Sequence, residues 1–127
     1  MKYGYKRKVE LPFAEAVEKT KAELAKEGFG VITEIDVKAT FKKKLDVDYD
    51  NYLILGACNP AFAHQALSSE KDIGLLLPCN VLVYEEGGEV FVSAIVPTVA
   101  MSVASNASLE HLATEVEEKL KKAVNAV

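Results

Sequence analysis

Residues 79–96 read CNVLVYEEGGEVFVSAIV, two apolar runs separated by a pair of glycines. Both runs are rich in the β-branched and aromatic residues that are typical of strands. Gly87-Gly88 provides a two-residue loop in which positive φ angles cost glycine nothing, so the stretch predicts a β-hairpin. A loop of this length also sets the register. The expected cross-strand pairs are Glu86 with Glu89, Val83 with Val92, Val81 with Ala94, and Cys79 with Val96.

Three further strands are expected before this hairpin. Residues 2–9 and 31–38 alternate apolar with polar side chains, which indicates strands with one solvated face. Residues 52–58 are apolar on both alternating faces. A strand of this kind needs cover on both sides, so it is expected in the middle of the sheet.

Three helices are expected between these strands. Pro12 suits the first helical position, where its missing N–H is not needed, and helical periodicity continues to about residue 27. Residues 39–46 fit a short amphipathic helix. Asn59-Pro60 combines an N-cap acceptor with a proline at the first helical position, so a helix is expected from there to Leu67.

A fourth helix is expected near the end of the sequence, capped by Ser108, with one apolar stripe that should lie on the sheet. The element order is then β-α-β-(short α)-β-α-β-β-α. This order indicates an α+β two-layer sandwich with a mainly antiparallel sheet and helices packed on one face. The length predicts a single domain over residues 1–127. The stripe comprises Leu109, Leu112, Ala113, Val116, Leu120, Ala123, Val124 and Val127.

Composition argues against several classes of function. The net charge is −4, whereas nucleic-acid binding normally requires a positive surface. The uncharged run 90–109 contains Pro97 and Asn106, which are incompatible with a membrane-spanning helix. The basic first residues are not followed by the apolar core of a signal peptide. We therefore expect a cytoplasmic protein with two reduced thiols and no nucleic-acid or membrane partner.

Charge is absent from three long stretches, residues 51–69, 73–84 and 90–109. Together they hold more apolar surface than one side of a small two-layer domain hides. Symmetric dimers are the commonest oligomers. The sequence therefore predicts a homodimer, with the outer face of the middle strands in the interface.

Two cysteines carry the candidate chemistry. Cys58 lies at a strand end directly before the Asn59 cap, where backbone N–H groups and the helix dipole favour a thiolate or a bound anion. Cys79 begins the hairpin, so the two thiols could meet across the sheet. A redox pair, half of a soft-metal site and simple core packing all remain open, because free cysteine is often buried as a small hydrophobic residue.

Three other side chains complete a candidate groove. His64 lies in the helix that starts at Asn59, Asn80 follows Cys79, and Met101 follows Pro97. Solvent exposure is the commoner outcome for a histidine at this phase of a helix, and core packing is the commoner outcome for a methionine. A metal site usually needs three or four ligands. No metal or cofactor is expected, and zinc or copper on Cys58, Cys79 and His64 is the alternative.

Three segments resemble one known family: LGACNP at 55–60, AHQAL at 63–67 and IGLLLPCNV at 73–81. They resemble the bacterial and archaeal domain-of-unknown-function family 302, in its cysteine-bearing version. The resemblance covers nearly the whole chain and implies a compact α+β fold that usually pairs into dimers. Pro97 also matches the pattern, whereas Val96 stands where many relatives carry an acidic residue. The resemblance therefore implies no carboxylate function at that position.

These observations predict a cytosolic homodimeric binding or accessory module. Its groove would take a small or anionic ligand through backbone N–H groups and polar amides. The alternative is a thiol-dependent redox, sulfur-handling or soft-metal protein that uses Cys58 and Cys79. A purely structural partner of another protein is the third alternative. The expected ligand-binding residues are Cys58, Asn59, His64, Cys79, Asn80 and Met101.

Overall fold

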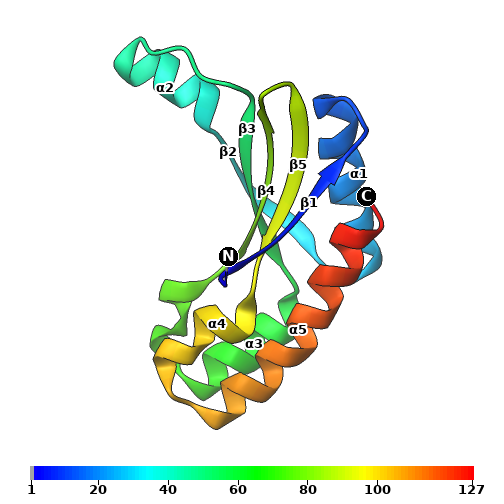
Figure 1. The fold of residues 1–127 in the computed structure, drawn as a ribbon. Helices are drawn as coiled ribbons and strands as arrows, with labels where there is room; N and C mark the ends of the chain where they lie inside the picture. The colour runs from blue at the N-terminus through cyan, green and yellow to red at the C-terminus, as the bar shows by residue number, and fades with distance from the viewer. Residues whose placement is uncertain (1) are drawn as a thin grey trace.

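The computed structural model describes residues 2–127. Five strands form one sheet in the order β1-β5-β4-β3-β2, and every neighbouring pair is antiparallel (Figure 1). The strands are β1 Gly4–Val9, β2 Gly30–Asp36, β3 Tyr52–Cys58, β4 Cys79–Glu86 and β5 Glu89–Ile95.

The helices are α1 Phe13–Lys26, α2 Val37–Leu45, α3 Pro60–Ser69, α4 Pro97–Ala100 and α5 Ala107–Asn125, with short 3-10 helices η1 Lys71–Leu76 and η2 Met101–Ala104. The predicted α+β architecture is confirmed.

The β4–β5 hairpin has the expected register over most of its length. Glu86 pairs with Glu89, and the ladder continues to Val81 opposite Ala94. The expected pair of Cys79 with Val96 does not form. The reason is that β5 ends at Ile95, and the Val96 N–H donates instead to the Tyr3 carbonyl at 2.8 Å.

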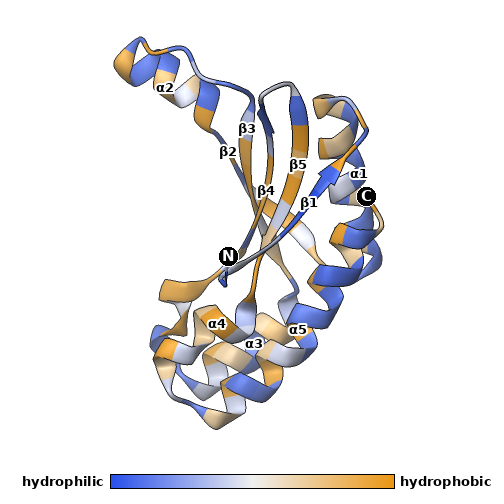
Figure 2. Ribbon diagram, in the orientation of Figure 1, coloured by the Kyte–Doolittle hydropathy of each residue, from blue (hydrophilic) through white to orange (hydrophobic). Residues whose placement is uncertain are grey.

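The main hydrophobic cluster lies between the sheet and two helices, α1 and α5, which run side by side on one face (Figure 1). Both helices carry hydrophilic as well as hydrophobic residues along their length, as amphipathic surface helices do (Figure 2). The cluster includes Leu24 of α1, Leu55, Val81 and Val92 of the sheet, and Leu120 of α5.

A second, smaller cluster lies beyond the end of the sheet. It brings together Ala66 of α3, Ile73 of η1, Met101 of η2, and Leu109 and Ala113 of α5. Between α3 and β4 the chain forms η1 and buries Ile73, and this short helix was not expected from the sequence. The α4–η2 segment was not predicted. Its short helices follow Pro97, which occupies the first position of α4.

Two predicted helix starts are wrong by one or two residues. Pro12 occupies the N-cap with an extended backbone, and α1 begins at Phe13. Asn106, not Ser108, caps α5, because its side-chain oxygen accepts the Ser108 N–H at 3.0 Å. Asparagine caps helices as well as serine does, so the earlier of the two residues starts the helix.

The second strand ends earlier than predicted. Asp36 accepts the Ala39 N–H at 2.9 Å and starts α2 at Val37, so residues 37 and 38 are helical. Helix α2 extends away from the rest of the molecule, and none of its residues is buried (Figure 1). The edge strand β2 is mostly exposed and contains a bulge between Val31 and Thr33.

Across residues 2–127, no helix is both long enough and apolar enough to cross a bilayer.

Gly56 of β3 lies at a position where the neighbouring side chains leave no space for a Cβ atom. A Cβ atom at this position would overlap the Thr33 Oγ1 and would lie 2.9 Å from Cγ of Pro78. Strand β3 can therefore approach β2 and the chain before β4 this closely only because residue 56 has no side chain.

We predict that Gly56→Ala lowers the free energy of unfolding by about 1–3 kcal/mol, because the added methyl group forces its neighbours apart. Urea denaturation measures the change. Gly30→Ala is the matched control in the adjoining strand, since a Cβ there meets nothing within 4 Å. Adding Thr33→Ala to Gly56→Ala should recover part of the loss. Equal losses in the two glycine variants would contradict this packing explanation.

Candidate functional site

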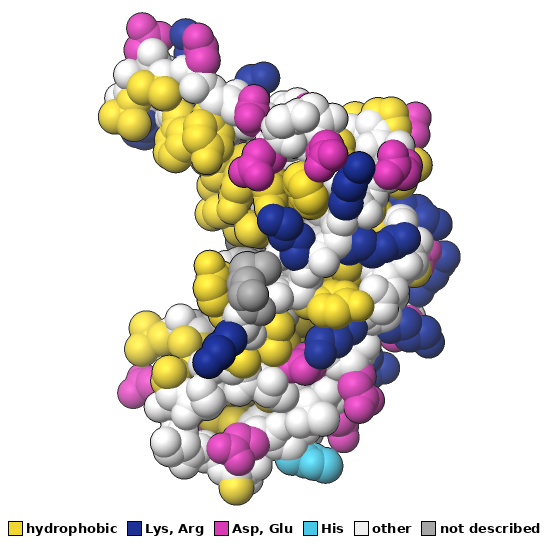
Figure 3. Space-filling view, in the orientation of Figure 1, with side chains coloured by type: hydrophobic (Ala, Val, Ile, Leu, Met, Phe, Trp, Pro, Cys, Tyr) yellow, Lys and Arg dark blue, Asp and Glu magenta, His cyan; other side chains and the backbone are white. Residues whose placement is uncertain are grey.

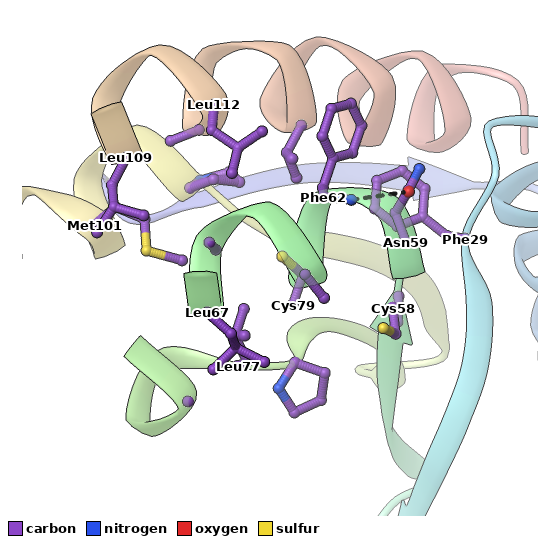
Figure 4. A pocket seen from close by; sticks show the side chains of 18 of the residues that line it. Phe29, Cys58, Asn59, Phe62, Leu67, Leu77, Cys79, Met101, Leu109 and Leu112 are labelled. Carbon is purple, nitrogen blue, oxygen red and sulfur yellow. Dashed lines mark hydrogen bonds between the residues drawn. The ribbon is translucent and has the colours of Figure 1, made fainter. Parts of the chain in front are cut away.

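An apolar pocket of about 300 Å³ lies where the two hydrophobic clusters approach each other (Figure 4). Phe29, Ala57 and Val116 of the main cluster line it. Residues of the second cluster line it as well, namely Ala66, Met101, Leu109 and Ala113. The pocket therefore occupies a gap between two packed groups of side chains.

The lining is almost entirely hydrocarbon, and no charged side chain belongs to it. Ile32 and Leu67 are 62% and 39% exposed, so they mark the opening to solvent, whereas the residues of the second cluster are buried. The polar side chains of the lining are Asn59 and the thiols of Cys58 and Cys79.

Asn59 is held in place by its role as the cap of α3. Strand β3 ends at Cys58, Pro60 begins the helix, and the Asn59 Oδ1 accepts the Phe62 N–H at 3.4 Å (Figure 4). Gly28, with a φ of 85°, closes the turn after α1 beside it. A Cβ on Gly28 would lie 2.9 Å from the Asn59 Nδ2, so this turn packs directly against the cap.

The two cysteines reach the pocket from adjacent strands. Ala57 is the cross-strand partner of Cys79, and Cys58 follows Ala57 at the end of β3. Both thiols are free and partly buried. Burial, with a smaller contribution from the nearby Cys58, raises the pKa of the Cys79 thiol to about 11. Cys79 is therefore a neutral thiol at physiological pH.

The other predicted site residues are divided between the pocket and the surface. Met101 lines the pocket and is 7% exposed. His64 is exposed on α3 and is not in the lining. Asn80 lies on the outer face of the sheet near Tyr52 and Tyr84, because successive residues of a strand point to opposite faces and Cys79 takes the inner one.

Several lining residues were not assigned to the groove from the sequence. Phe62, Ala63 and Leu67 come from α3, and Leu112 and Ala113 come from the predicted stripe of α5. The apolar stripe predicted burial of Leu112 and Ala113, but only the packing of α3 against α5 shows that the two helices share the lining of one pocket. The sequence feature that indicates this space is the set of small alanine side chains on α3, of which Ala63 and Ala66 line the pocket.

The surroundings of the pocket offer few side chains that could bind a metal ion. In the part of the chain that the structure describes, no three His, Cys, Asp or Glu side chains lie close enough together to hold a metal ion. The second histidine, His111, is exposed on α5, with its Nε2 3.5 Å from Glu115 Oε1.

A row of aromatic rings, which we call the outer-face ladder, runs from α2 and the loop after it onto the outer face of the sheet: Phe41, Tyr49, Tyr52, Tyr84 and Phe91. Successive ring centroids lie 5.0, 6.3, 5.3 and 5.4 Å apart. The Lys6 ammonium lies 4.7 Å from the Phe91 centroid. Hydrophobic side chains also gather on α2 and on the adjoining end of the sheet (Figure 3).

Comparisons with known proteins identify the family but not the ligand. The family model described as domain of unknown function DUF302 matches residues 5–127. The crystal structure of an uncharacterized conserved protein DUF302 from Bacillus stearothermophilus is similar, with a TM-score of 0.93 and 27% sequence identity. That alignment covers 99% of this chain and 98% of the other. No curated protein matches this chain.

We predict that Cys79 reacts slowly with alkylating reagents. In a Cys58→Ala variant at pH 8, its rate should be about 100-fold below that of the same chain unfolded in urea. The reason is that a pKa of about 11 in place of 9.0 reduces the thiolate fraction by that factor. Iodoacetamide labelling followed by mass spectrometry measures both rates, and equal rates would contradict the shift.

The raised pKa also sets the sign of a pH effect on stability. Folding keeps this thiol protonated, so its contribution to the free energy of unfolding is complete below pH 9 and is lost as the pH rises toward 11. Cys79→Ala should lack this part of the pH dependence.

Proposed function

This chain belongs to the DUF302 family, and we propose that it is a cytosolic, homodimeric binding or accessory module that holds a small ligand in the apolar pocket. The observation that carries the proposal is the pocket itself, a hydrocarbon cavity of about 300 Å³ that opens to solvent near Ile32 and Leu67. Ligand sites in proteins are usually concave, mostly apolar and supplied with a few polar groups. Asn59 and the two thiols are such groups here.

The lining favours a small organic ligand over an inorganic anion. Anion sites at helix N-termini use free backbone N–H groups, commonly with a cationic side chain nearby. At the start of α3 the Phe62 N–H is already bonded to Asn59, and no lysine or arginine lines the pocket.

A thiol-dependent redox, sulfur-handling or soft-metal function of Cys58 and Cys79 is the second candidate. Its support is that both cysteines line one pocket. The raised pKa of Cys79 lowers its reactivity at neutral pH, and His64 is not positioned in the pocket to complete a zinc or copper site. Ligand binding is therefore the preferred function.

The outer-face ladder supports the dimer. Leu82 and Tyr84 point away from the helices, and a two-layer fold leaves this side of the sheet without a covering layer. Tyr3, Ile35 and Leu45 are also at least half exposed. A second copy of the chain would cover these side chains in a symmetric interface.

We predict that Ala63→Phe weakens binding of indole, used here as a probe, because the new ring occupies the pocket. Ala61→Phe is the matched control, since Ala61 lies on the exposed side of the same helix. Methyl chemical shifts of the lining residues report binding. Indole should bind the wild type and Ala61→Phe, with at least a tenfold lower affinity for Ala63→Phe.

Inorganic phosphate should produce no shift at the start of α3. Binding of phosphate but not of indole would replace the small organic ligand with an anion, and binding of neither probe would contradict the proposed pocket function.

We also predict that Leu82→Glu converts the dimer to a monomer, because it places a charge in the apolar interface. Sedimentation velocity measures the mass in solution, and circular dichroism checks that the fold is retained. Thr114→Glu on the exposed side of α5 is the control and should remain dimeric. A wild-type chain that sediments as a monomer at micromolar concentration would refute the interface.

A further inference from the structure

We infer that the pocket takes a molecule with an uncharged aliphatic hydrocarbon body, such as an alkyl chain of roughly ten carbons, which is buried between α3 and α5. This inference rests on the proposed binding function and specifies the class of ligand. An engineered apolar cavity of about 150 Å³ holds one benzene molecule. The present pocket has about twice that volume, at about 300 Å³.

The lining excludes an ionised group from the interior of the pocket. None of its side chains carries a charge that could pair with one. An unpaired charge in a hydrocarbon environment is strongly unfavourable. The same burial keeps the thiol of Cys79 protonated, which indicates how poorly the pocket solvates an anion. A charged head is tolerated only at the mouth, near Ile32 and Leu67.

The lining also offers few hydrogen bonds to a polar ligand. The Asn59 oxygen is occupied by the Phe62 N–H, which leaves its Nδ2 and two thiols as polar contacts. A sugar or a nucleotide would lose the hydrogen bonds that it makes to water without replacing them. An alkyl chain loses none.

The deep end of the pocket suits a flexible chain. Met101 lines it together with Leu109 and Leu112, and the unbranched methionine side chain adapts to irregular shapes. A bound chain would contact both hydrophobic clusters and join them through a continuous set of apolar contacts. Because it would bind only the folded state, it should also stabilise the protein against unfolding.

A homologous series of 1-alkanols from butanol to dodecanol tests the inference with the full-length chain. Each methylene that enters the pocket should strengthen binding about fourfold, which corresponds to about 0.8 kcal/mol per buried methylene. The gain should stop when the pocket is full. Isothermal titration calorimetry measures the dissociation constants, and Ala61→Phe serves as the control for Ala63→Phe, which should bind no alkanol.

The position of the charge is tested with three compounds of equal length. Octanol and octanoate should bind, because octanoate can leave its carboxylate at the mouth. Octanedioate should bind at least tenfold more weakly, because a second carboxylate would enter the hydrocarbon interior. Bound octanol should also slow alkylation of Cys79 in the Cys58→Ala variant, which places the ligand beside that thiol.

A second variant keeps the test decisive if Ala63→Phe does not fold. Met101→Ala enlarges the deep end of the pocket. The chain length at which the alkanol affinity stops rising should therefore increase by one to three carbons. Equal binding of octanedioate and octanol would overturn the inferred ligand class, and so would an affinity that does not depend on chain length. If indole still binds in that case, the proposed binding function stands. Failure of both indole and the alkanols would overturn the proposed function as well.

Discussion

The apolar stripe of α5 packs against two hydrophobic clusters that do not merge. Leu120 and Val124 pack on the main cluster over the sheet, whereas Leu109 and Ala113 pack with Ile73 and Met101 beyond its end. Small domains usually have one contiguous core. Here a single rigid helix spans both clusters, and the side chains between them are too small to close the gap. The pocket is the space that remains, and its position is set by the point at which α5 passes from one cluster to the other.

A partly buried carboxylate links α4 and α5, which both contribute residues to the lining of this space. Glu117 of α5 accepts hydrogen bonds from the N–H and the hydroxyl of Thr98 at the start of α4, at 3.1 and 2.5 Å. Burial raises the pKa of Glu117, but these bonds and the ammonium of Lys121 outweigh it, so the net shift is downward and the group stays ionised. The contact ties α4 to α5, and η2 with Met101 follows directly. The second cluster therefore depends on a polar anchor as well as on apolar packing.

The parts of the fold that were predictable from the sequence are those determined by local chemistry. Gly87-Gly88 set the register of the hairpin, and Asn59-Pro60 marked the start of α3. Local signals are ambiguous where two residues that can cap a helix lie close together: the predicted cap of α5 was Ser108, whereas Asn106 is the observed one. Of the candidate site, Cys58 and Cys79 at the ends of β3 and β4 were predicted correctly, whereas Asn80 points to the opposite face because successive residues of a strand alternate. The remaining lining residues belong to helices whose mutual packing no local pattern encodes.

The pleat of β3 and β4 separates the two surfaces to which we assign functions. Leu55 and Val81 point into the main cluster, while Tyr52 and Tyr84 stack on the opposite face. A ligand under α3 and a second copy on the outer-face ladder would therefore use the same strands without competing for the same side chains. The close contacts of Gly56 lie between the two sites along β3, and close-packed interiors transmit displacement. Each of the two sites can be blocked separately from its own face of the sheet.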